Sequence, residues 1–388
     1  MHPHVHGFVA PGFENLAETF GETNRGSSGG SALAVLIGGE PVVDIWAGVA
    51  DPYTSRAWEA DTPTVVFSCT KGVMSLLIGQ LVQSGTLKLD AAVTDYWPEF
   101  GANGKERITV RQLLAHRAGL AAPRQDIDLE TALDWNAVVN TLADQEPLWE
   151  PGTAYGYHAL TFGWLTGELV GRATGQTVSE YLRATVTGPL GADFWIGLPD
   201  SAAARVARLI ASDTPDDAAP GGSGIDPTDA YWMERSMTLG AAFPATLVRP
   251  GEGFDDPRVQ KAEIPGAGGI ATANALATIW SAAVTPTRGV RLLDDSVIQD
   301  MTEVQSEGAP VWWLPGPYPR WGTGFMLTSE RRTFLTSRSF GHDGAGGQVA
   351  FADPEHKVGF AYTTNVLKGQ DDRRGSALVQ ALQAALEG

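Results

Sequence analysis

Cysteine is almost absent from this chain of 388 residues, since Cys69 is the only one. No intrachain disulfide can form, so the sequence shows no adaptation to an oxidising compartment. Apolar runs of ~18 to 20 residues, the length needed to span a bilayer, are also missing. The N-terminus lacks both a basic region and a continuous apolar core, so we expect no secretory leader and a cytoplasmic location.

Basic residues are scarce as well. There are 27 lysines and arginines against 45 aspartates and glutamates, a net charge of −18. This balance argues against nucleic acid and anionic membranes as partners, because both require positive patches. It favours neutral or cationic substrates. No HExxH or CxxC spacing occurs, so we expect no metal site.

The composition that remains, with 43% apolar and 19% charged residues, is typical of a soluble globular protein of two or three domains. "ALAVLI" and "VVDIWAGVA" flank a "GGEP" turn, and "VAFA" and "KVGFAYTTN" flank "DPEH". Both patterns predict β-hairpins. The first lies near the N-terminus and the second near the C-terminus, which predicts one antiparallel sheet assembled from both ends of the chain.

Helical patterns dominate the middle of the chain and also occur at both ends. "FENLAETFG" and "RGSALVQALQAALEG" predict terminal helices, and "LDWNAVVNTLADQ" and "ALTFGWLTGELVGRATG" lie between them. A segment rich in proline, glycine and aspartate begins at Ser212. We therefore predict an α/β (α+β) fold of two domains. Residues 1–95 and 241–388 form the sheet domain, and residues 96–240 form a mostly helical domain with loops.

Two serines are candidate nucleophiles. Ser28 lies in "GSSGG", which formally matches the G-x-S-x-G motif of esterases. That motif requires a strand followed by a helix, whereas here a helix precedes and a strand follows. We interpret Ser28 as part of a flexible connector.

Ser68 and Lys71 form the stronger candidate pair. They lie three residues apart in "FSCTK", directly before the apolar run "GVMSLLIGQLV". If a helix begins at Ser68, both side chains share one face, and Lys71 can reach the serine hydroxyl. Apolar neighbours would desolvate the ammonium group and lower its pKa toward that of a useful base.

At this point the sequence resembles the serine β-lactamase and penicillin-binding protein superfamily, in its class C-like branch near the family VIII carboxylesterases. The resemblance runs over nearly the whole chain. Five ordered blocks carry it: "VVFSCTKGVMSLLIGQLVQSGTLKLDAAVTDYWPEF", "ITVRQLLAHRAGL", "EPGTAYGYHALTFGWLTGELV", "GAGGIATANALA" and "FGHDGAGGQVAFADPEHKVGFAYTTN". It implies a β-lactamase/DD-peptidase-like fold and an acyl-enzyme formed on Ser68.

The family's second motif, Y-x-N, corresponds to Tyr157-His158-Ala159. The resemblance implies that Tyr157 takes part in proton transfer, which a phenol with a pKa of ~10 can do beside a cation such as Lys71. The third motif, K-T-G, corresponds to His342-Asp343-Gly344. The resemblance also implies an oxyanion hole formed by the backbone N–H groups of Ser68 and Ala345.

Both motifs depart from the lactamase pattern. Ala159 replaces an amide that would bind a lactam side chain, and His342 replaces a lysine that would bind a carboxylate. These changes point toward uncharged esters rather than penicillins.

An aromatic segment, "VWWLPGPYPRW", could form a wall of the acyl or alcohol pocket or could seal an edge of the core. Its aromatic residues are Trp312, Trp313, Tyr318 and Trp321.

The combined prediction is a serine carboxylesterase that hydrolyses short-chain neutral esters and needs no cofactor. The alternatives are a β-lactamase or D-aminopeptidase-like amidase, an acyltransferase, and a penicillin-binding sensor that acylates and stops. The oligomeric state, the natural substrate and the choice between Lys71 and Tyr157 as the resting base stay open.

Overall fold

The protein was analysed as a computed structural model that describes residues 4–211, 226–312, 315–369 and 372–388. The proline-rich segment that begins at Ser212 therefore lies mostly outside the described residues, as does Trp313. Within the described ranges, no helix is long and apolar enough to cross a membrane.

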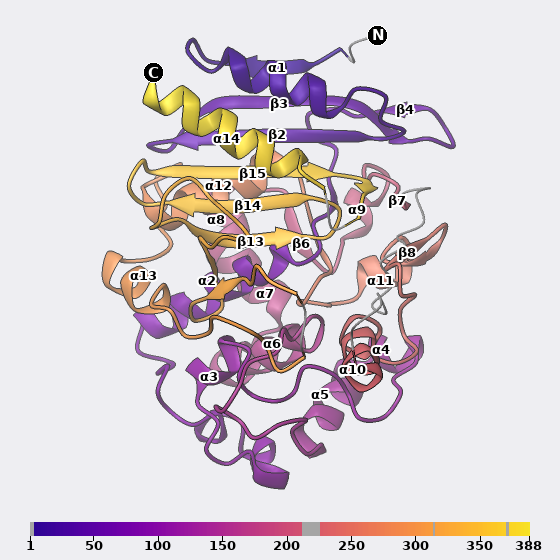
Figure 1. The fold of residues 1–388 in the computed structure, drawn as a ribbon, viewed down its shortest axis with the longest axis vertical. Helices are drawn as coiled ribbons and strands as arrows, with labels where there is room; N and C mark the ends of the chain where they lie inside the picture. The colour runs from indigo at the N-terminus through magenta and orange to yellow at the C-terminus, as the bar shows by residue number, and fades with distance from the viewer. Residues whose placement is uncertain (1–3, 212–225, 313–314, 370–371) are drawn as a thin grey trace.

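A nine-stranded antiparallel sheet forms the upper part of the molecule in Figure 1, and both ends of the chain contribute to it. Its order is β1-β3-β2-β15-β14-β13-β12-β11, with β4 (Arg56–Ala57) paired to β3. The strands from the N-terminal end are β1 (His6–Val9), β2 (Gly30–Ile37) and β3 (Glu40–Asp51). Those from the C-terminal end are β11 (Arg320–Trp321), β12 (Met326–Leu327), β13 (Phe340–Gly344), β14 (Gln348–Asp353) and β15 (Val358–Thr364).

The two predicted hairpins are confirmed. Strands β2 and β3 pair across Gly38 and Gly39, which both have positive φ as the tight turn requires. Strands β14 and β15 pair across the "DPEH" turn. The two hairpins join because β15 pairs with all of β2 except its first residue, from Ile37 opposite Val358 to Ser31 opposite Thr364. The sheet assembled from both ends of the chain is therefore also confirmed.

Helices cover both faces of this sheet. The terminal helices α1 (Glu14–Thr23) and α14 (Arg374–Glu387) contact each other and lie on one face (Figure 1). Helix α12 (Ala273–Val284) packs on the other face against β2, β14 and β15. Helix α2 (Cys69–Gln83) packs on that same side, against β13.

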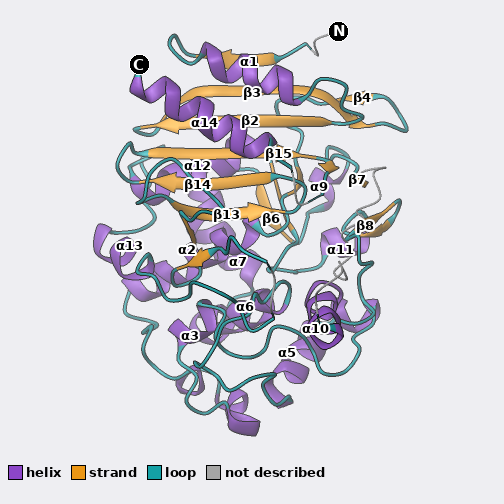
Figure 2. Ribbon diagram, viewed as in Figure 1, coloured by secondary structure: helices purple, strands orange, loops and turns teal. Residues whose placement is uncertain are grey.

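The lower part of the molecule consists mainly of helices and loops (Figure 2). Its helices include α3 (Val110–Leu114), α4 (Leu129–Leu133), α5 (Trp135–Asp144), α6 (Thr161–Thr174), α7 (Val178–Leu182) and α10 (Pro227–Thr238). Helix α6 packs against α2 and so connects this region to the sheet. The domain boundaries at residues 95 and 240 stay a prediction.

A second, three-stranded sheet lies between the two regions. Its order is β5 (Thr64–Val65), β10 (Gly269–Ala271) and β6 (Phe194–Ile196). Strand β5 ends three residues before Ser68, so this small sheet positions the segment that leads into α2.

Candidate active site

Ser68 occupies the N-cap position of helix α2, as the sequence predicts. Between Thr62 and Gly79 it is the one residue that is not buried, so its hydroxyl alone faces outward from an otherwise enclosed segment. Phe67, directly before it, is buried with φ +45, a backbone conformation that costs a non-glycine residue about 1–3 kcal/mol. The surrounding structure holds this strained turn, which brings Ser68 to the surface of the site.

Lys71 is fully buried one turn into the same helix. Its Nζ lies 3.0 Å from Ser68 Oγ, 2.6 Å from the carbonyl oxygen of Ala159 and 2.6 Å from that of Gly266. Burial lowers the pKa of Lys71 well below its ordinary value. A neutral amine has two hydrogens and one lone pair, so it can donate to both carbonyls and accept the hydrogen of the Ser68 hydroxyl.

Tyr157 lies in the loop that leads to α6. The Ser68 side chain lies near enough to its phenol to affect the phenol pKa, and Lys71 Nζ lies 4.9 Å from the centre of its ring. The indole of Trp321 stacks on the ring, with centroids 5.3 Å apart and planes inclined by 19°. Burial raises the pKa of Tyr157 above that of a free phenol, which keeps the hydroxyl protonated.

Two buried histidines that sequence reasoning did not single out hold the Tyr157 loop. The backbone N–H of His158 donates to Nδ1 of His116 at 3.3 Å, and the N–H of Leu120 donates to Nε2 of His158 at 3.1 Å. The Nδ1–H of His158 therefore donates to the carbonyl of Gly156 at 2.6 Å. Burial lowers the pKa of both histidines, that of His158 to about 4. Both histidines lie inside sequence blocks that carry the family resemblance, and this position could have marked them as candidates.

His342 lies on β13, on the side of the sheet that faces α2. A β-carbon on Gly72 of α2 would lie 3.5 Å from that of His342. The Nδ1–H of His342 donates to the carbonyl of Asp343 at 2.7 Å, and Nε2 is buried without a partner among the described residues. Burial and the nearby Lys71 lower the pKa of His342 to about 3, so the ring is neutral at physiological pH.

The end of β13 approaches the start of α2 closely. Gly344 makes this possible, because a β-carbon there would lie 2.5 Å from the Val66 carbonyl oxygen and 3.1 Å from Cys69 Sγ. Among the described residues, neither the backbone N–H of Ser68 nor that of Ala345 donates a hydrogen bond to the protein. Strand β12 pairs with Phe340 and Gly341 of β13 and ends there. The edge of β13 from His342 to Gly344 therefore has no pairing with β12.

The aromatic segment serves more than one role. Trp321 is 2% exposed and contacts Tyr157, whereas Trp312 packs edge-on against Trp149 at 5.8 Å. Tyr318 is partly exposed, and Trp313 lies outside the described residues. Trp149 also packs edge-on against His158, which extends the aromatic surface toward the Tyr157 loop.

Ser28, the rejected nucleophile candidate, lies exposed in the loop between α1 and β2. No described group of three histidine, cysteine or acidic residues is placed to hold a metal ion.

Comparisons with known proteins identify the family of the chain. The profile of the family described as "Beta-lactamase" matches residues 13–385. "Esterase/beta-lactamase LipL" from Mycobacterium tuberculosis is 34% identical over 380 residues, which cover 94% of this chain and 83% of that protein.

Two solved structures are similar over almost the full length. One is a family VIII carboxylesterase, with a TM-score of 0.88 and 32% identity over 98% of this chain and 100% of that one. The other is a penicillin-binding protein homolog from Caulobacter crescentus, with a TM-score of 0.86 and 35% identity over the same two shares. These matches confirm the predicted fold class.

Proposed function

The chain belongs to the beta-lactamase family and is a serine hydrolase, and from this premise we propose that it hydrolyses short-chain, uncharged carboxylic esters through an acyl-enzyme on Ser68. The observation that carries the proposal is the environment of Lys71. Two carbonyl oxygens occupy two directions around its Nζ, and Ser68 Oγ occupies a third at 3.0 Å.

In the first step, the neutral amine of Lys71 takes the Ser68 proton as Oγ attacks the ester carbonyl. The electron pair of the C=O bond moves to the oxygen, which the N–H groups of Ser68 and Ala345 stabilise. The C–O bond to the alcohol then breaks, and Tyr157 donates its phenolic proton to the departing oxygen. The Lys71 ammonium stabilises the resulting phenolate and returns a proton to it.

Hydrolysis of the acyl-enzyme repeats these steps with water as the nucleophile. Water loses a proton to the same Lys71 and Tyr157 pair and attacks the acyl carbon, and Ser68 Oγ recovers a proton as it leaves. In this proposal Lys71 is the resting base, because burial lowers the pKa of its amine and raises that of Tyr157.

Preference for uncharged esters follows from the charge of the third motif. His342 is neutral at physiological pH, and Arg332 pairs with the neighbouring Asp343 at 2.7 Å and donates to Ser376. No free positive charge is therefore supplied by these residues to bind the carboxylate of a penicillin. The relative LipL carries both "esterase" and "beta-lactamase" in its name, so the two activities must be compared directly.

The test is the initial rate on p-nitrophenyl butyrate and on a chromogenic cephalosporin, for the wild type, Ser68→Ala and the control Ser28→Ala. We expect rapid ester hydrolysis that Ser68→Ala abolishes and Ser28→Ala leaves intact, with little cephalosporin turnover. Ester hydrolysis that survives in Ser68→Ala would overturn the nucleophile, and a dominant cephalosporin rate would identify a β-lactamase.

Two further readouts separate the remaining alternatives. An ester formed with added methanol would identify an acyltransferase. A stoichiometric burst with no turnover would identify a penicillin-binding sensor.

A further inference from the structure

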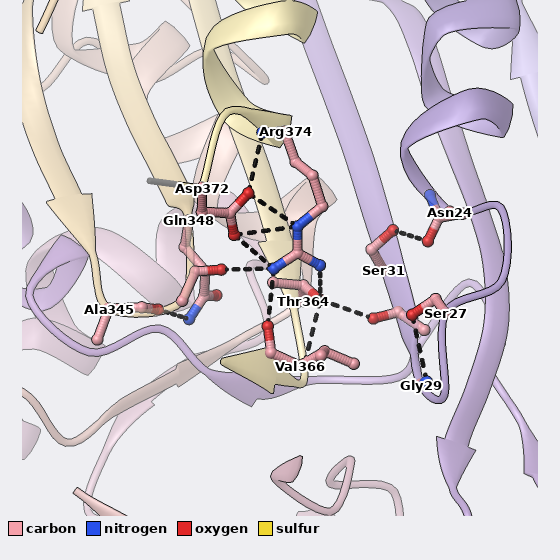
Figure 3. A network of polar contacts seen from close by, with 12 residues as sticks. Asn24, Ser27, Gly29, Ser31, Ala345, Gln348, Thr364, Val366, Asp372 and Arg374 are labelled. Atoms are coloured by element: carbon pink, nitrogen blue, oxygen red, sulfur yellow. Dashed lines mark hydrogen bonds and ion pairs between the residues drawn. The ribbon is translucent and has the colours of Figure 1, made fainter. Parts of the chain in front are cut away.

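Gln348 joins two segments that are distant in the sequence. It is the first residue of β14 and is fully buried. Its Nε2 donates to the carbonyl of Val65 at 3.0 Å and to the carbonyl of Ala345 at 3.3 Å. Figure 3 shows the second of these bonds, which crosses the base of the loop between β13 and β14.

These two segments carry the two N–H groups of the proposed oxyanion hole. Val65 lies three residues before Ser68, and Ala345 supplies the other N–H itself. An oxyanion hole requires both donors to reach one oxygen at about 2.7–3.1 Å, so their separation must be held closely.

No β-ladder sets this separation. Val65 belongs to β5 of the small three-stranded sheet, whereas Ala345 follows β13 of the large sheet. Packing brings the two together where Gly344 approaches Val66 and where the Cys69 thiol donates to the carbonyl of His342 at 3.3 Å. The amide of Gln348 adds a direct polar connection between the sheets, on the side of the loop.

A buried ion pair between Arg374 and Asp372 also contacts this loop. Arg374 donates through Nη2 to Asp372 at 2.6 Å (Figure 3) and to the carbonyl of Gly346 at 2.9 Å. The side chains of Arg374 and Asp372 are both less than 8% exposed. The carbonyls of Ala345 and Gly346 are thus each held by a buried side chain. The Ala345 N–H belongs to the peptide plane just before these two, and only the φ and ψ of Ala345 join it to the held Ala345 carbonyl.

We propose that Gln348 is a positioning residue that sets the separation and direction of the Ser68 and Ala345 N–H groups. This inference rests on the proposed function, because it gives these N–H groups their role. A side-chain amide suits the position, since one nitrogen must donate two hydrogens to two carbonyl oxygens. Glutamate would place an acceptor there, and methionine has no donor.

The test compares Gln348→Met with the matched control Gln145→Met. Gln145 is also buried and also bridges backbone groups, donating to the carbonyl of Ala122 at 3.0 Å and accepting from the N–H of Arg124 at 3.2 Å. It lies in the helical region, at the end of α5. The two variants should therefore lose similar amounts of folding stability, whereas only Gln348→Met should lose catalytic activity.

For Gln348→Met we expect kcat on p-nitrophenyl butyrate to fall about 10- to 100-fold, less than the full loss of one oxyanion donor, with KM within about 3-fold of wild type. A trifluoromethyl ketone forms a tetrahedral adduct whose oxygen occupies the same hole, so its affinity should fall in proportion to kcat/KM. Gln145→Met should keep wild-type kcat and wild-type affinity for the ketone.

Gln348→Asn provides a second variant, because it keeps the amide but is one methylene shorter and should lie between wild type and Gln348→Met. Wild-type kcat in Gln348→Met, or a fall in kcat without a matching fall in ketone affinity, would overturn the proposal. So would circular dichroism showing that both Gln348 variants unfold while Gln145→Met stays folded.

Labelling of Ser68 by a fluorophosphonate separates this inference from the proposed function. A wild type that hydrolyses no ester and is not labelled at Ser68 would overturn the proposed function and the inference with it. A wild type that is labelled and hydrolyses esters, alongside a fully active Gln348→Met, would overturn the positioning role alone.

Discussion

Gly163 of helix α6 packs directly against the backbone of Gly266, whose carbonyl accepts a hydrogen bond from Lys71. A β-carbon on Gly163 would lie 2.0 Å from the Gly266 nitrogen, and one on Gly266 would lie 2.4 Å from the Leu160 carbonyl oxygen. Two glycines therefore allow the backbone contact that places one of the two acceptors around the Lys71 amine.

Gly163→Ala should lower both stability and activity. Overpacking at this contact costs about 1–3 kcal/mol of folding stability. If Gly266 moves to relieve the steric clash, its carbonyl moves away from Lys71. The control is Gly171→Ala in the same helix, where the nearest atom to a new β-carbon is 3.8 Å away. That variant should gain about 0.5–1 kcal/mol from helix propensity and keep full activity. Urea denaturation and kcat measured on both variants check this expectation.

Lys71→Met should lower kcat about 10²- to 10⁴-fold, the usual contribution of a general base. The wild-type profile of kcat/KM should rise with pH and level off well below pH 10.5, because burial lowers the pKa of Lys71. The variant should lose this rise. Rates measured on p-nitrophenyl butyrate across pH 5 to 9 give both results.

Lys105→Met is the matched control, since Lys105 is also fully buried and its Nζ also donates to two backbone carbonyls, those of Ala102 and Gln145. Within the described part of the chain, its Nζ forms no hydrogen bond with a hydroxyl group. Lys105→Met should lose stability but keep the pH profile. An unchanged profile in Lys71→Met would contradict the assignment of Lys71 as the base.

Tyr157→Phe should lower kcat about 10²-fold or more while KM changes little, because only the hydroxyl that donates to the departing alcohol is lost. Stacking on Trp321 and burial of the ring are retained. Tyr155→Phe is the control, since the Tyr155 hydroxyl is also lost from a buried ring but donates to the Gly308 carbonyl. Equal losses in the two variants would contradict a specific role for Tyr157.

Acid should destabilise the protein through its buried histidines. The pKa of His342 is lowered to about 3 and that of His158 to about 4, against an ordinary value near 6.5. Between these values the unfolded state binds more protons than the folded state, so the free energy of unfolding falls as pH falls from about 6.5 toward 4. Thermal denaturation followed from pH 7 to 4 should show this decline.

His342→Gln should reduce the slope of that decline, because it removes one buried imidazole with a lowered pKa. Equal slopes in wild type and His342→Gln would show that other groups cause the acid destabilisation.

Much of the fold was predictable because it follows from local patterns. Alternating and continuous apolar runs around Gly-Gly and Asp-Pro turns predicted the two hairpins, and helical spacing predicted α5, α6 and α14. The Ser68 and Lys71 pair was predictable for the same reason, since a separation of three residues in a helix places both side chains on one face.

The remaining parts of the site depend on contacts that leave little trace in the sequence. Ala159 and Gly266 act through their carbonyl oxygens, which every residue possesses, so nothing in their side chains marks them as partners of Lys71. Nothing in the sequence distinguishes Gln348 from other glutamines. Its contacts with Val65 and Ala345 exist only because the fold brings the end of β5 close to the end of β13. Trp321 belongs to an aromatic segment whose contact with Tyr157 spans more than 160 positions of the chain.

The sequence by itself therefore determined the elements, the family and the pair of residues that one helix holds together. Tertiary structure alone decided the burial that lowers the pKa of Lys71 and the carbonyl groups that its amine contacts. The pKa of a buried amine depends on how completely water is excluded and on which backbone groups replace it. Here α6 and β13 pack against α2, and the carbonyls of Ala159 and Gly266, which precede α6 and β10, accept from the amine.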